Sequence, residues 1–237
     1  MKVRIKFSKY GAMKFIGHLD VMRYFQKVMR RADIDIAFTG GFSPHMIMSF
    51  ALPLGVGVTS SGEYLDIEIH TPISSKEAVR RLNEVMVEGI CVQSFRQIEE
   101  GKSGKAMSLV AAADYTVAFR EGKEPPAGWQ EKFDEFLAQK QINILKKTKK
   151  SEKEVNICPM IYNCCTENEQ VRMTVAAGSA ANLKPELVIE AFASYIGWNM
   201  PEFSLLIHRS ELYADTGTET QQKLVSLEEL GEEILGS

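Results

Sequence analysis

Two histidines and one aspartate stand close to glycines near the start of the chain, where such side chains could do acid–base chemistry. His18 and Asp20 follow Gly17, and His45 ends a turn-forming stretch at residues 39–45. Imidazole titrates near neutral pH, so His18 and His45 could act as general acid and base if they flanked one cleft. The alternatives are a half-buried His18, an Asp20 that interacts with the helix dipole, and a His45 that stabilises its turn. We keep the three as catalytic candidates and favour a non-enzymatic function.

A stripe of cations follows on the next predicted helix. Apolar residues recur with helical period over residues 19–32, and basic residues occupy the opposite side. The cations of this stripe are Arg23, Lys27, Arg30 and Arg31, and Lys14 lies just before the helix. Four like charges on one face repel each other unless anions meet them, so phosphate is the expected ligand. The alternative is an ordinary solvated helix face.

Residues 39–45, with the sequence TGGFSPH, form a loop by composition. The two glycines allow positive φ and a close approach of the backbone to a ligand, and the proline stiffens the turn. We therefore name Gly41, Phe42 and Ser43 as candidate ligand-binding residues. Phe42 and the later Tyr64 are expected to be available for stacking on a base.

A second loop of small residues, 177–185, leads into a predicted helix. Free amides at a helix N-terminus can hold an anion, so Ser179 and Asn182 are further ligand candidates. The loop does not end in Gly-Lys-Ser/Thr and is not a Walker loop, and a simple helix-entry turn is the alternative. The basic run at residues 146–150 is interpreted as a solvated hairpin tip, with phosphate contact as its alternative.

Composition argues against several kinds of site. The net charge of -3 does not favour nucleic-acid binding by the protein as a whole, so only a local basic patch could bind nucleic acid. The four cysteines form no C-x-x-C pair, and no third ligand is spaced to complete a metal site around the histidines. These cysteines are Cys91, Cys158, Cys164 and Cys165. We expect reduced thiols, no metal, no cofactor, no membrane span and a cytoplasmic location.

The order of predicted elements repeats along the chain. Strands are predicted at residues 3–8, 34–38, 46–50, 64–69 and 90–95, with helices at 19–32 and 75–87. The pattern recurs with strands at 115–120, 142–147, 154–163, 170–176 and 203–209, and helices at 125–139 and 185–196. Strict alternation in the first strand predicts one buried face.

We therefore predict an α+β protein of two tandem ferredoxin-like units, each with the order β-α-β-β-α-β and one additional strand. The first unit is residues 1–98, and the second is residues 110–213. A polar linker at residues 99–109 joins them. An acidic tail follows at residues 214–237, in which residues 224–235 could form a short helix.

Five short motifs resemble those of one bacterial family. They are KFIGHLD at 14–20, RRA at 30–32, GFSPH at 41–45, GEYLD at 62–66 and NLKPE at 182–186. Together they are similar to the uncharacterised radical-SAM-linked bacterial proteins, over roughly residues 1–213. Members of that family occur beside, or fused to, cobalamin-binding radical SAM enzymes, so the resemblance implies a radical SAM partner. This chain has no three-cysteine cluster motif and is not itself the radical enzyme.

Three functions remain open on the sequence. The first is a non-enzymatic accessory protein of a radical SAM system that binds RNA or another phosphate-bearing substrate through its N-terminal unit. The second is a protein–protein adaptor for the radical SAM partner, for which an exposed apolar patch would be the sign. The third is a metal-independent RNA-processing enzyme that uses His18 and His45. We rank the first two above the third.

Overall fold

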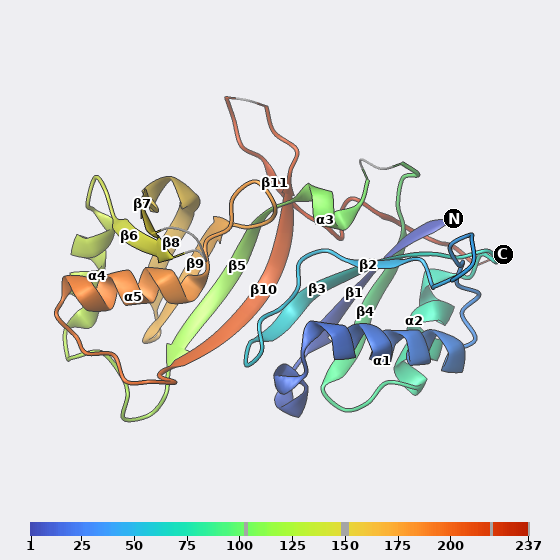
Figure 1. Cartoon of the computed structure of the whole chain (residues 1–237), viewed down its shortest axis with the longest axis horizontal. Coiled ribbons are helices and arrows are strands. Elements are labelled where there is room, and N and C mark those ends of the chain that lie inside the picture. Colours follow the sequence, from blue (N-terminus) through green and yellow to red (C-terminus); the bar gives the residue numbers. More distant parts are fainter. Residues whose placement is uncertain (102–103, 148–151, 219, 237) are drawn as a thin grey trace.

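A single large sheet organises the molecule. The computed structural model describes residues 1–101, 104–147, 152–218 and 220–236. Within these residues the chain forms an α+β fold on a mostly antiparallel sheet of ten strands, with a separate two-stranded hairpin. Figure 1 shows that the sheet crosses the whole molecule and that the helices pack against it in two groups.

The N-terminal half of the sheet is formed by residues 1–97. Its elements are β1 (Lys2–Lys9), the 3-10 helix η1 (Gly11–Phe15), α1 (His18–Arg31), β2 (Met48–Phe50), β3 (Thr59–Glu68), α2 (Ser75–Glu84) and β4 (Ile90–Gln97). The strands lie in the order β4-β1-β3-β2, and each neighbouring pair is antiparallel. Strand β1 therefore has neighbours on both edges.

The C-terminal half repeats this arrangement. Its elements are α3 (Ala106–Leu109), β5 (Val110–Phe119), α4 (Trp129–Leu137), β6 (Asn143–Lys147), β7 (Glu152–Asn156), η2 (Cys158–Met160), β8 (Ile161–Glu167), β9 (Gln170–Ala176), α5 (Pro185–Tyr195) and β10 (Leu205–Asp215). The order β10-β5-β9-β8 is again antiparallel throughout, and β6 pairs with β7 outside the sheet.

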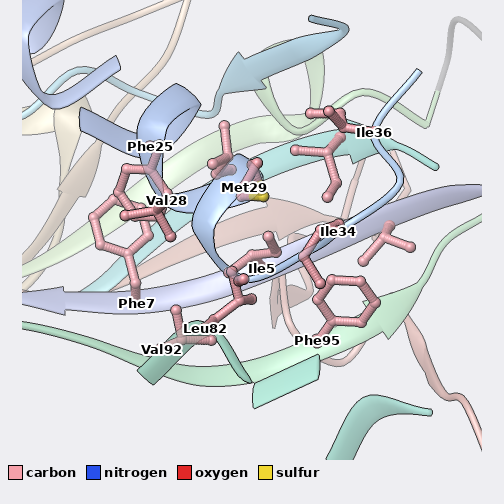
Figure 2. Close-up of a cluster of buried hydrophobic side chains, with 14 of the residues drawn as sticks. Ile5, Phe7, Phe25, Val28, Met29, Ile34, Ile36, Leu82, Val92 and Phe95 are labelled. Atoms are coloured by element: carbon pink, nitrogen blue, oxygen red, sulfur yellow. The ribbon is translucent and has the colours of Figure 1, made fainter. Parts of the chain in front are cut away.

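Helix α1 is fixed by its apolar side. Figure 2 shows Phe25, Val28 and Met29 of this helix packed over Phe7 of β1. The rings of Phe7 and Phe25 have centroids 4.8 Å apart. Burying each such side chain stabilises the fold by roughly 1.5–3 kcal/mol, so the helix cannot rotate without a large loss. The basic side of α1 is thereby forced to face outward.

An aromatic cluster holds α4 and α5 against the second half of the sheet. Phe133 of α4 and Phe192 of α5 meet edge to face, with centroids 4.8 Å apart. Trp129, at the start of α4, contacts both rings. Edge-to-face packing adds to the burial energy of aromatic residues, so this cluster fixes α5 against α4.

The two halves meet where β3 lies beside β10. The two strands are parallel and pair at Thr59 and Ser60, while residues 65–67 on the same edge of β3 pair with β2. Between these two pairings, a Cβ on Gly62 would lie 2.5 Å from the carbonyl oxygen of Ser210. Only glycine permits this approach of β10. The predicted unit boundaries at residues 98 and 110 stay a prediction, because one sheet runs through both halves.

The prediction that β1 buries a single face was wrong. Ile5 is buried under the helices, but Arg4 and Ser8 on the opposite face are also buried. The cause lies in the C-terminal residues, whose Leu227 carbonyl oxygen accepts a hydrogen bond from Arg4 at 3.1 Å. A distant segment of the chain therefore covers the face that the local pattern assigns to solvent.

Two predicted strands also differ from the structure. Residues 34–38 form isolated bridges, Ile36 to Ile69 and Phe38 to Met46, and no regular ladder. The strand predicted at 154–163 is split into β7 and β8 by η2, which contains a proline at its start. Proline lacks the N–H that a ladder requires, so the strand breaks there.

The C-terminal residues form strands and not the short helix that residues 224–235 suggested. Strand β11 (Leu224–Ser226) pairs with β10, and β12 (Glu232–Glu233) pairs with β4. Between them, the side chain of Leu227 is fully buried. The backbone amide of Ile234 donates to Ser75 Oγ at 2.8 Å. The tail is thereby attached to the N-terminal half.

Candidate functional site

The basic stripe lies on the exposed side of α1. Arg23, Lys27, Arg30 and Arg31 are all exposed. The guanidinium of Arg23 donates to Asp20 at 3.1 Å, which partly neutralises its charge. Among the described residues, no carboxylate oxygen lies within 4.0 Å of the cationic groups of the other three. Three neighbouring cations are thus available for phosphate.

The loop at residues 39–45 extends into solvent with a fixed base. Gly41 has a φ of 96°, in the region that glycine allows, and Phe42 is fully exposed. The backbone amide of His45 donates to Thr39 Oγ1 at 3.1 Å, and His45 Nδ1 lies 3.1 Å from the same oxygen. Ser43 is also exposed. The loop is therefore closed at its base while its tip can contact a ligand.

His18 and His45 occupy different surroundings. His18 is half-buried and meets the ring of Phe50 edge to face, with centroids 5.1 Å apart. His45 lines a hollow beside β2 and β3 that does not include His18. In the part of the chain that the structure describes, no hydrogen bond joins the two imidazoles. The RNA-processing hypothesis stays a prediction.

Tyr64 cannot stack on a base, which corrects the sequence prediction. Its side chain is 1% exposed, and its hydroxyl donates to Glu211 Oε1 at 2.6 Å. Burial and the carboxylate of Glu211 raise the pKa of Tyr64 far above its ordinary value. Lys14 differs, because its ammonium lies 5.1 Å from the ring centroid of Phe15, which is itself well exposed. Lys14 remains a candidate ligand residue and Tyr64 does not.

The GEYLD motif joins the two halves of the sheet. Gly62 admits β10, and Glu63 accepts two hydrogen bonds from Arg209, at 2.9 Å to Oε1 and 2.6 Å to Oε2. Asp66 accepts two more from Arg4, at 2.8 and 3.0 Å. Such bidentate pairs are strong and directional. The motif is explained by structure, whereas the exposed loop at 39–45 is not.

A second ionic cluster lies on the sheet face that the tail covers. Lys6 Nζ donates to Glu211 at 2.7 Å and to Glu228 of the tail at 3.0 Å. Burial alone would raise the pKa of Glu228, but hydrogen bonds from Lys6 and Ser94 outweigh it, so the pKa lies below its ordinary value. The attachment of the tail therefore depends on an ionised carboxylate.

A pocket between the two halves brings together segments that the sequence did not connect. It lies between the loop at residues 52–55 and the start of α5 at residues 182–186, with Arg209 in its lining. Asn182 lines this pocket, and Ser179 does not. The structure therefore combines one predicted ligand residue with an arginine that the sequence interpretation missed.

Across the described ranges, no three His, Cys, Asp or Glu residues are arranged to hold a metal ion. No helix in the described part of the chain is long and apolar enough to cross a membrane. The side chains of the basic run at 146–150 lie outside the described residues, so its interpretation stays a prediction.

Fold and site together define an α+β protein with a cationic helix face on one half and a pocket between its halves. The chain belongs to the family DUF2344, described as "Uncharacterized protein conserved in bacteria", whose model matches residues 2–185. No curated protein matches the sequence. Among solved structures, it is similar to a chain of a Cbf5-Nop10-Gar1 complex, with 12% identity and a TM-score of 0.44. The match covers 89% of this chain and 48% of the other, so this chain spans about half the length of that one.

Proposed function

We propose that the protein binds RNA or another phosphate-bearing substrate through the cationic face of its N-terminal half. The observation that carries this proposal is the set of exposed cations Lys27, Arg30 and Arg31, which have no carboxylate partner among the described residues. Phosphate contacts of this kind supply most of the sequence-independent affinity for nucleic acid.

The loop at residues 39–45 lies near this surface. Arg30 of α1 and Phe38, which directly precedes the loop, line one hollow together. The base of the loop is therefore close to the C-terminal end of α1. Phe42 at the exposed tip has a free aromatic face for a base, while the cations hold the backbone.

We further infer that the protein is a non-enzymatic accessory of a radical SAM enzyme. This rests on the motif resemblance to proteins encoded beside, or fused to, such enzymes. The strand orders β4-β1-β3-β2 and β10-β5-β9-β8 correspond, which supports two tandem ferredoxin-like units.

The test is the nucleic-acid content of protein purified from its native host. One variant changes Lys27, Arg30 and Arg31 to alanine. The matched control changes the same number of exposed cations on the other half, namely Lys132, Lys140 and Arg172. We expect RNA to co-purify with the wild type and the control and to be absent from the α1 variant. Clean wild-type protein, or RNA retained by the α1 variant, would overturn the proposal.

An adaptor function is the second candidate, because one end of the N-terminal half exposes apolar side chains. Phe15, Leu19 and Val56 are each more than half exposed. The backbone amide of Gly57 donates to the Lys14 carbonyl oxygen at 2.8 Å, which brings the loop carrying Val56 to η1. Exposed patches of this kind often contact another protein. Capture of a radical SAM protein that fails when the three become serine would favour this function.

A further inference from the structure

The pocket between the halves has a polar floor and apolar walls. It forms a partly open hollow of about 120 Å³. Arg209 and Tyr115 come from the neighbouring strands β10 and β5, while Leu52 and Leu54 belong to the loop after β2. Both halves of the chain contribute to this lining, so the pocket exists only in the assembled fold.

Arg209 is held in place with one nitrogen uncommitted to the ion pair. Its side chain is 2% exposed. Nε and Nη2 donate to Glu63, and Nη2 also donates to the Leu52 carbonyl oxygen at 2.7 Å. A guanidinium has five N–H donors, so Nη1 is left for the nearby Tyr115 hydroxyl or for a ligand in the pocket. The ion pair thus fixes the geometry of a remaining donor.

The buried groups around Arg209 carry an excess of positive charge. Lys9 is 2% exposed, and its Nζ donates to the Ile16 carbonyl oxygen at 2.8 Å. Burial lowers the pKa of Lys9, Glu63 opposes this effect, and Arg209 adds to it. Two cations therefore share one carboxylate in this region of the sheet. An anion in the pocket would balance the charge.

The rim of the pocket adds exposed polar groups. Asn182 and Lys184 are exposed and lie directly before α5. Glu186 is an acid in the lining and would repel an anion. These charges suit a ligand with a single acidic group bound near Arg209 and Lys184. The apolar part of such a ligand would pack against Leu52.

We propose that this pocket binds a small organic anion, with a carboxylate or phosphate directed at Arg209 and Lys184 and an apolar portion against the loop at 52–55. The site is separate from the cationic face of α1 and does not depend on the function proposed for that face. Ligand binding here would link the two halves, because its contacts come from both.

The experiment is a titration followed by amide chemical shifts of the full-length protein. The probes are phenyl phosphate, benzoate and inorganic phosphate, each to about 10 mM, a range that detects weak binding. We expect saturable shifts at the amides of Gly55 and Glu186 with at least one organic anion. Whether phenyl phosphate or benzoate binds more tightly identifies the acidic group.

Three variants test the assignment, at residues that are exposed or, for Glu186, partly exposed. The double change Asn182→Ala and Lys184→Ala should weaken binding about tenfold or more, since it removes a charge-assisted contact. Glu186→Gln should tighten binding, because it removes a repulsive charge. The control Lys27→Ala and Arg30→Ala should leave the affinity unchanged.

Some outcomes would overturn the proposal. No saturable shift at these amides would exclude the site, and so would binding that survives the double change. Inorganic phosphate that binds as tightly as phenyl phosphate would exclude a role for the apolar wall. Loss of binding in the α1 control would assign the anion to the α1 surface and not to this pocket.

Discussion

The ion pair of Glu63 with Arg209 offers a direct test of how the halves are joined. Its side chains are 5% and 2% exposed, and both carboxylate oxygens accept hydrogen bonds from the guanidinium. Glu63→Gln preserves the shape and removes the charge, so Arg209 stays buried without compensation. Breaking a buried pair in this way costs about 3–5 kcal/mol. In a chain of this length each kcal/mol lowers Tm by about 2–4 °C, so we expect a fall on the order of 10 °C.

The assay is thermal and urea unfolding, with Glu77→Gln as the matched control. Glu77 pairs with Arg80 and Arg81 on the outer side of α2, where solvent screens the interaction. The control should unfold close to the wild type. The double change Glu63→Leu and Arg209→Met should recover part of the loss, because the unpaired charge is removed. Equal effects of Glu63→Gln and Glu77→Gln would refute the reasoning.

Three further predictions concern packing, pH and thiol chemistry. Gly62→Ala should destabilise the fold by about 1–3 kcal/mol in urea unfolding, since its Cβ would meet the β10 backbone, while Gly40→Ala, with no atom within 4 Å, should not. The pKa of Glu228 in the folded protein lies below its ordinary value of 4.5, so the ion pair with Lys6 stabilises the tail above that pH and is lost as the pH falls through the folded pKa. Amide hydrogen exchange of the tail should therefore become faster as the pH falls through this range, once the intrinsic pH dependence of exchange is corrected for. The change Glu228→Gln should abolish this pH dependence. Burial raises the pKa of Cys164 to about 12, so iodoacetamide at neutral pH should alkylate the exposed Cys165 first by mass spectrometry, and equal rates would contradict this.

Local periodicity was sufficient to predict α1 and its outward cations. The apolar positions that include Phe25 and Met29 recur at helical spacing, and the structure packs them into the core. The same reasoning placed the basic residues on the opposite side. The glycine pair in the loop allowed positive φ, and the structure uses it at Gly41.

Partners distant in sequence could not be predicted by such rules. The alternation of β1 grouped Arg4 with Lys6 correctly, but it could not show that the tail, with Leu227, covers them. Arg209 lies two residues after Ile207 in a predicted strand, so both side chains point to the same face. A cation on an apolar face of a strand is a signal of a buried ion pair. Its partner Glu63 lies 146 residues away. Only the tertiary fold connects them.

The salt dependence of RNA binding tests the central proposal most directly. Fluorescence anisotropy of a labelled single-stranded RNA would be recorded between about 50 and 200 mM salt, where three phosphate contacts give a slope of about -2 in log affinity against log salt. We expect this slope for the wild type and for the control variant in which Lys132, Lys140 and Arg172 become alanine. When Lys27, Arg30 and Arg31 become alanine, we expect both the affinity and the slope to be nearly lost. Equal affinity at low and high salt, or an α1 variant that binds like the wild type, would contradict the proposal.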